Sequence, residues 1–110
     1  MERTNNSHRA WREIPVQIRR YLESVSKFID YKRGENVWRA GDHPRGLFIV
    51  DSGLIGLSII GNSGKEHLVR FCKEGQFFGH RSLFADEVYN ASAVALEPSR
   101  LRFIPRQEIL

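Results

Sequence analysis

The spacing of apolar positions changes near residue 27 of the 110-residue chain. Before that point, apolar side chains recur at the three- and four-residue intervals of a helix. One face of this helix would carry Ile14, Ile18, Tyr21, Leu22 and Val25. Pro15 suits the first helical turn, where its missing N–H group would have had no partner. The pattern predicts a leading helix over residues 10–26.

Short apolar runs separated by glycine follow this helix. They predict strands over residues 28–32, 36–39, 47–51, 54–60, 67–72, 91–96 and 101–104. Gly34 marks a turn between the first two strands. Gly61-Asn62-Ser63-Gly64 predicts a hairpin because these residues tolerate positive φ, and the alternating run 67–72 reads as its return strand. The pattern predicts a mostly β protein, an antiparallel β-roll of the double-stranded jelly-roll type.

The two ends of the chain have different patterns. Residues 1–10 read as a flexible N-terminal arm, and residues 11–110 read as one domain. Pro105 would open a final helix, with Ile109 and Leu110 beginning its apolar face. A helix of barely one turn is unstable alone. We therefore expect a piece of a longer protein, truncated at the start of a connecting helix.

Composition agrees with an ordinary globular domain. The chain is 41% hydrophobic and 27% charged, and no apolar run approaches the roughly 20 residues that span a bilayer. No secretory signal pattern opens the sequence, and the single Cys72 cannot form an internal disulfide. We expect a cytoplasmic protein with no membrane partner. The net charge of +4 comes from scattered Lys and Arg, which indicates a mixed surface rather than a nucleic-acid site.

The order of the glycines resembles that of cyclic nucleotide-binding domains. The similar segments are 31–42 (YKRGENVWRAGD), 47–53 (LFIVDSG), 64–66 (GKE) and 75–79 (GQFFG). The likeness covers about residues 25 to 110. The leading helix and the residues Arg81-Ser82-Leu83-Phe84 resemble Crp/Fnr-type transcription regulators more than channels or kinases.

The resemblance implies an effector-sensing module without enzymatic activity. It implies a small-molecule effector and a homodimer in the full-length protein. In that family the roll precedes a long dimerisation helix and a helix-turn-helix domain. We therefore expect DNA binding only through a domain that this chain lacks.

The resemblance also places the ligand at a phosphate-binding cassette with a short helix. The candidate ligand-binding residues are Gly79, His80, Arg81, Ser82, Tyr89 and Asn90. His80 holds the position of the family's ribose-binding glutamate, and Tyr89 that of its phosphate-binding arginine. A charge-assisted bond of about 1.5–3 kcal/mol to the phosphate is thereby lost. We expect weak cyclic-nucleotide binding, or binding of another small ligand.

Several roles for these side chains stay open. Arg81 either approaches an anion or is an exposed helix residue. His80 is either a proton-linked switch or a packing residue, and Tyr89 either stacks on a ligand or, as we favour, fills the vacated pocket. Haem held by His80 or Cys72 is an open alternative that the sequence does not favour. One cysteine cannot hold an iron–sulfur cluster, and no His-x-His pair predicts a metal site.

Two other functions are alternatives. The chain could be a regulatory domain of a channel, transporter or enzyme. It could also be a ligand-free dimerisation platform whose pocket is closed by Tyr89 and Phe84. We expect the residues that follow Leu110 to separate the regulator from the first alternative.

Overall fold

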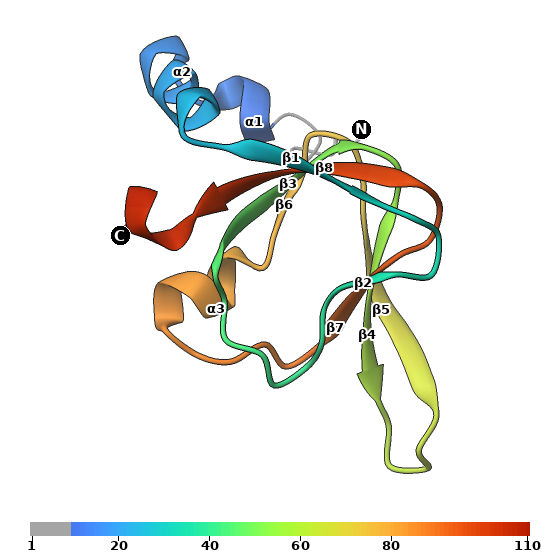
Figure 1. The fold of residues 1–110 in the computed structure, drawn as a ribbon. Coiled ribbons are helices and arrows are strands. Elements are labelled where there is room, and N and C mark those ends of the chain that lie inside the picture. Colours follow the sequence, from blue (N-terminus) through green and yellow to red (C-terminus); the bar gives the residue numbers. More distant parts are fainter. Residues whose placement is uncertain (1–9) are drawn as a thin grey trace, which may run out of the picture.

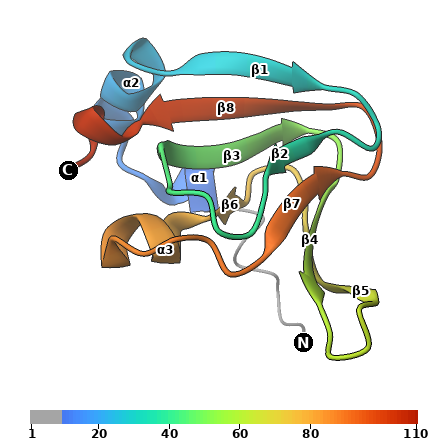
Figure 2. The same cartoon turned by 60° about the horizontal axis from the view of Figure 1, so that its bottom comes forward.

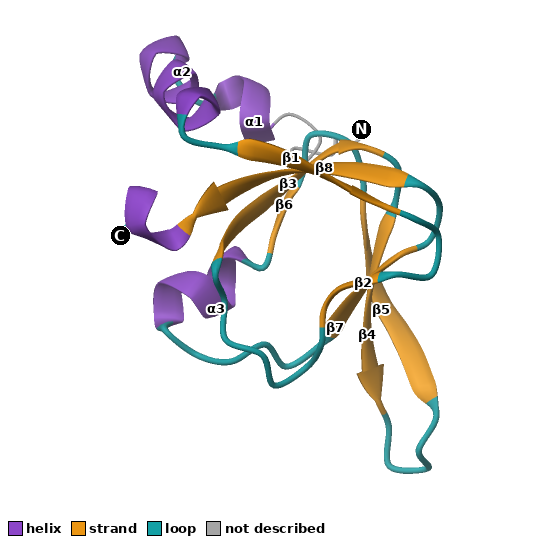
Figure 3. Ribbon diagram, viewed as in Figure 1, coloured by secondary structure: helices purple, strands orange, loops and turns teal. Residues whose placement is uncertain are grey.

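A computed structural model describes residues 10–110, so residues 1–9 of the expected flexible arm lie outside the described part of the chain. Strands dominate the fold, and three short α-helices accompany them (Figures 1 and 3). The helices are α1 (Ala10–Glu13), α2 (Val16–Ser24) and α3 (His80–Ala85). The strands are β1 (Lys27–Tyr31), β2 (Asn36–Trp38), β3 (Gly46–Ser52), β4 (Ile55–Ile60), β5 (Glu66–Cys72), β6 (Phe77–Phe78), β7 (Ser92–Ala95) and β8 (Ser99–Pro105). A 3-10 turn, η2 (Arg106–Glu108), follows β8.

The strands form two four-stranded antiparallel sheets. One has the order β1-β8-β3-β6 and the other the order β2-β7-β4-β5, which confirms the predicted antiparallel β-roll. Every strand expected from the sequence is present, with bounds within two residues of the expected ones. Chain neighbours β1 and β2 lie in different sheets, so Gly34, at φ +90°, carries the chain between sheets rather than closing a hairpin. The hairpin at residues 61–64 does join β4 to β5, as predicted.

The core has two parts, one on each face of β3. Phe48 and Val50 face the space between the sheets, whereas Leu47 and Ile49 face the helices. The inner cluster is Trp38, Phe48, Val50, Ile55, Cys72, Phe78, Tyr89, Ala93, Ala95 and Leu101. The outer cluster is Leu47, Ile49, Leu83 and Ile104, covered by Trp11, Leu22, Val25, Phe77 and Ile109. Because β3 is buried on both faces, its sequence is a continuous apolar run rather than an alternating one.

The N-terminal helix differs from the prediction. Residues 10–26 form two helices, because the chain leaves the helical conformation at Ile14 and Pro15. Pro15 precedes the second helix with φ −51° and ψ 142° instead of lying in its first turn. Proline disfavours helical geometry in the residue before it, here Ile14, and α1 accordingly ends at Glu13. Of the expected apolar face, Leu22 and Val25 pack against the outer cluster, whereas Ile18 and Tyr21 are half exposed.

Two further segments depart from the sequence pattern. The β4–β5 hairpin projects from the body of the roll (Figures 1 and 2), and residues 66–71 of β5 are exposed although their alternation predicted one buried face. β6 was not predicted, since two residues are too short to show a period. The expected helix at Pro105 is the single 3-10 turn η2. No helix among the described residues is long and apolar enough to cross a membrane.

Candidate functional site

The predicted cassette is a short helix, α3, joined directly to β6. Gly79 precedes it in the left-handed conformation, with φ +80° and ψ 2°. A Cβ atom at this position would lie 2.6 Å from Cη2 of Trp38 and 3.2 Å from Cε1 of Tyr89. Only glycine fits both the backbone angle and the close approach. Leu83 is fully buried in the outer cluster, which fixes α3 against the sheet.

His80 and Arg81 at the start of α3 line a pocket of about 450 Å³. Arg70 of β5 faces the same pocket, and Phe77 and Ala10 supply its apolar wall. Both arginines are exposed, and neither forms an ion pair with the residues that the structure describes. Two guanidinium groups over an apolar wall are an arrangement suited to an anion that also has an apolar part.

The imidazole of His80 is half-buried at this pocket. Its Nδ1 atom is buried and has no hydrogen-bond partner among the described residues. Burial, followed by the positive charges of Arg70 and Arg81, lowers the pKa of His80 below its ordinary value. The ring is therefore neutral at neutral pH, and an anion bound beside it would raise the pKa again.

The lowered pKa of His80 predicts a loss of stability in mild acid. The unfolded chain takes up the imidazole proton near pH 6.5, before the folded protein does, so the free energy of unfolding falls as the pH drops from 7.5 to 5.5. His80→Gln removes this proton linkage, and we expect a shallower fall when urea unfolding is measured at both pH values. Arg81→Gln, which removes one repelling charge, gives an intermediate slope. An unchanged slope in His80→Gln would contradict the prediction.

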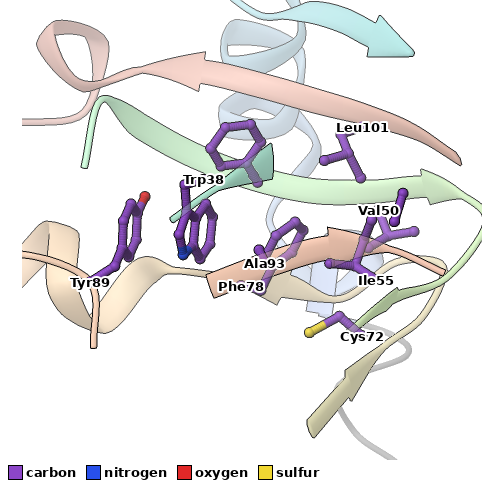
Figure 4. Close-up of a cluster of buried hydrophobic side chains, with 10 residues drawn as sticks. Trp38, Val50, Ile55, Cys72, Phe78, Tyr89, Ala93 and Leu101 are labelled. Carbon is purple, nitrogen blue, oxygen red and sulfur yellow. The ribbon is translucent and has the colours of Figure 1, made fainter. Parts of the chain in front are cut away.

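Tyr89 lies apart from His80, inside the inner cluster. Its side chain is 5% exposed, and its ring stacks on Trp38 with centroids 3.8 Å apart and planes 4° from parallel (Figure 4). The Trp38 Nε1 atom donates a 2.8 Å hydrogen bond to the Ala91 carbonyl oxygen, just beyond the tyrosine. The Tyr89 hydroxyl has no partner among the described residues. Burial, with a contribution from the Asp42 carboxylate, raises the pKa of Tyr89 to about 12.

The structure therefore divides the candidate residues. His80 and Arg81 share a pocket, whereas Tyr89 packs in the core and lines a different cavity. Asn90 is exposed, and the Ser82 carbonyl oxygen accepts the Glu87 N–H group at 3.0 Å. Phe84, which would close the pocket with Tyr89 in the ligand-free alternative, is 58% exposed.

Arg70 is the pocket residue that the sequence reasoning missed. It stands in the run Leu68-Val69-Arg70-Phe71 of β5. A lone arginine among apolar strand residues was an available signal, but its distance from the cassette along the chain concealed the contact.

Cys72, the other residue considered for haem, lies in the inner cluster and is fully buried. Burial raises the pKa of its thiol despite the nearby positive charge of Arg70. The thiolate that would ligate a metal is therefore disfavoured. No group of three or more His, Cys, Asp or Glu side chains gathers as a metal site in the described ranges.

Comparison with known proteins identifies the family. The model of the cyclic nucleotide-binding domain matches residues 28–110. The cyclic AMP receptor protein of Thermus thermophilus is 31% identical over 80 residues, which are 73% of this chain and 37% of that protein. The anaerobic regulatory protein of Bacillus subtilis is 28% identical over 97 residues, which are 87% of this chain and 41% of that protein. The cGMP-dependent protein kinase of Caenorhabditis briggsae is 30% identical over 83 residues, which are 69% of this chain and 11% of the kinase.

The solved structures agree with these relatives. The catabolite activator protein of Thermus thermophilus superposes with a TM-score of 0.77 at 28% identity, over 87% of this chain and 45% of that one. The chain thus spans less than half the length of these regulators. Its two-sheet roll, its glycine-led cassette helix and these matches lead to one conclusion: the chain belongs to the cyclic nucleotide-binding domain family and has Crp/Fnr-type regulators among its homologues.

Proposed function

We propose that the chain is the effector-sensing domain of a Crp/Fnr-type transcription regulator. In this proposal the effector is a small anion-bearing molecule held by Arg70, His80 and Arg81, and cyclic nucleotides bind weakly. The observation that carries the proposal is the pocket at the start of α3, where Arg70, Arg81 and the half-buried His80 meet and neither arginine has an ion pair within residues 10–110.

The chemistry of this pocket supports an anion. A negative charge there would pair with both guanidinium groups and would let His80 become protonated, so that Nδ1 gains a partner. The same pocket lacks the family's usual anchors: the glutamate position is His80, and the arginine position, Tyr89, packs in the core. The ribose and cyclic phosphate would therefore lose their ordinary contacts.

An effector in this pocket would contact a residue that also packs in the body of the roll. Phe77 lines the pocket and packs against the outer cluster, against which Ile109 near the end of the chain also packs. Occupation would change the packing of that cluster. In the proposed regulator this bias would shift the population between two arrangements of a dimer and so change DNA binding by a domain outside this chain.

We expect cyclic AMP at millimolar concentration to leave the melting temperature nearly unchanged. A ligand at 100 times its Kd stabilises the native state by about 2.7 kcal/mol, which a domain of this size shows as a shift of several degrees. Absence of a shift in differential scanning fluorimetry would set Kd above roughly tens of micromolar. Saturable binding of cyclic AMP at micromolar concentration would contradict this part of the proposal.

Two sets of variants separate the possible outcomes. His80→Glu with Tyr89→Arg restores the family's anchor types, but position 89 lies in the core and not in this pocket, so we expect no gain in affinity for cyclic AMP over the unmodified chain. Arg70→Gln with Arg81→Gln removes the proposed anion contacts, and Arg39→Gln with Arg45→Gln is a control of equal charge outside this pocket. Inorganic phosphate and small carboxylates are then tested on three proteins: the unmodified chain, the Arg70/Arg81 variant and the Arg39/Arg45 control. Equal stabilisation of all three would contradict the proposed anion site.

One comparison favours a second candidate, a regulatory domain attached to an enzyme. The similar kinase is a cGMP-dependent enzyme by name, and the match covers 69% of this chain and 11% of the kinase. The full-length gene decides between the two. A helix-turn-helix pattern in the parent protein supports the regulator, whereas a catalytic domain supports the enzyme.

A further inference from the structure

A cleft of about 760 Å³ lies beside the turn from β3 to β4. Trp11 and Arg12 of α1 line it together with the β5–β6 turn at residues 73–75. Glu97, just before β8, and Arg102 of β8 also contribute to its wall. Its volume is within the range of about 300–1,000 Å³ in which proteins hold small molecules.

The buried part of the wall is apolar. Ile49 and Val50 of β3 line the cleft and are 3% and 1% exposed. Trp11 packs against the outer cluster, and its ring meets Phe77 edge to face with centroids 6.4 Å apart. These contacts hold the indole in place. A fixed apolar wall favours an occupant with an apolar side chain.

Charged side chains of both signs surround this apolar wall. None of them forms an ion pair with another residue in the range 10–110. Opposite charges that converge on one cleft without pairing leave contacts for a ligand with a positive and a negative group. The six residues are Arg12, Lys73, Arg102, Asp51, Glu74 and Glu97.

Arg102 is a half-buried positive charge that lacks a carboxylate partner among the described residues. Its guanidinium carbon lies 5.3 Å from the ring centroid of Trp11 and 4.5 Å from that of Phe28. Its Nη1 atom donates a 2.7 Å hydrogen bond to Oγ of Ser26. These contacts fix the side chain but supply no negative charge. A carboxylate in the cleft would supply it.

We propose that this cleft is a binding site for a short zwitterionic peptide with apolar side chains. The peptide carboxylate pairs with Arg102, its ammonium group pairs with Glu74 and Glu97, and an apolar side chain lies against Trp11. A ligand with one sign of charge would leave half of these groups unused. The cleft shares no lining residue with the pocket at the start of α3, so the site does not rest on the proposed function.

Leucyl-leucine and two of its derivatives test the proposal. N-acetyl-leucyl-leucine lacks the ammonium group, and leucyl-leucine amide lacks the carboxylate. Binding is followed by NMR through the indole N–H signal of Trp11, with that of Trp38, which does not line this cleft, as an internal control. We expect leucyl-leucine to bind about fivefold more tightly than either derivative, because each derivative loses one charged contact at a partly exposed site.

Charge-removing variants assign the two ends of the peptide. Arg102→Gln should abolish the preference for leucyl-leucine over its amide. Should this variant lose its fold, Arg12→Gln, which changes an exposed residue of the same cleft, should reduce the same preference. Glu74→Gln with Glu97→Gln should abolish the preference over the N-acetyl form. Arg39→Gln lies outside the cleft and should keep both preferences.

Three results would overturn the proposal. Leucyl-leucine at millimolar concentration could leave the Trp11 signal unmoved, or the unmodified protein could bind all three peptides equally. The third is that the variants within the cleft keep both preferences, as the Arg39→Gln control does.

Discussion

Gly79→Ala is expected to lower the free energy of unfolding by about 2–4 kcal/mol, the sum of left-handed backbone strain and overpacking. The strain arises because Gly79 has φ +80°. The overpacking arises because the new methyl group would lie 2.6 Å from the Trp38 ring, which is held on its other faces by Phe48 and Phe78. Chemical unfolding measures the loss, and the melting temperature should fall by about 10 °C or more.

Gly34→Ala is the matched control that measures the cost of left-handed backbone strain without overpacking. Gly34 has φ +90°, but a Cβ atom there would meet no heavy atom within 4 Å. We expect it to cost about 1–2 kcal/mol, the left-handed strain alone. Equal losses in the two variants would mean that Trp38 yields to the methyl group, and that the close approach at Gly79 is not a constraint.

The contrast between these glycines explains why the roll was predictable from the sequence. Gly34, Gly53, Gly64, Gly75 and Gly79 all adopt positive φ at corners between strands. Each corner needs a residue that tolerates positive φ, and this need can be recognised from that residue and its sequence neighbours alone. The order of such corners therefore specified the strands and the family resemblance, although it did not specify which strands pair. Pairing depends on contacts distant in sequence, and so the pattern predicted the turn at Gly34 but not that β1 and β2 lie in different sheets.

The candidate site was predictable only in part, for the same reason. His80 and Arg81 are adjacent in sequence and were found together. Arg70 reaches them from another strand, and no local pattern indicates that approach. Tyr89 shows the converse. Its position in the cassette suggested a ligand contact, whereas its ring packs in the core against Trp38, which lies 51 positions earlier in the sequence.

Trp38→Ala is expected to cost about 3–5 kcal/mol of the free energy of unfolding, the usual loss for a large buried aromatic side chain. Trp38 is 7% exposed and contacts Phe48, Phe78 and Tyr89, with centroids 5.5, 5.3 and 3.8 Å away. A domain of this length is stable by only about 5–15 kcal/mol. We therefore expect the variant to be partly unfolded near 37 °C, as measured by urea unfolding and circular dichroism.

A double-mutant cycle tests whether Trp38 also holds the cassette loop. Trp38→Phe keeps a ring but removes the N–H donor to Ala91, and we expect a loss of about 1–2 kcal/mol from this bond and the smaller buried area. Combining Trp38→Leu with Tyr89→Leu should reveal a coupling of about 0.5–1.5 kcal/mol from the stack. Additive losses would contradict this, because they would mean that Tyr89 keeps its place without the tryptophan. Non-additive losses would instead mean that Trp38, as part of the inner cluster, holds residues 89–91 in position. Trp38 would then also determine how much space is available beside α3.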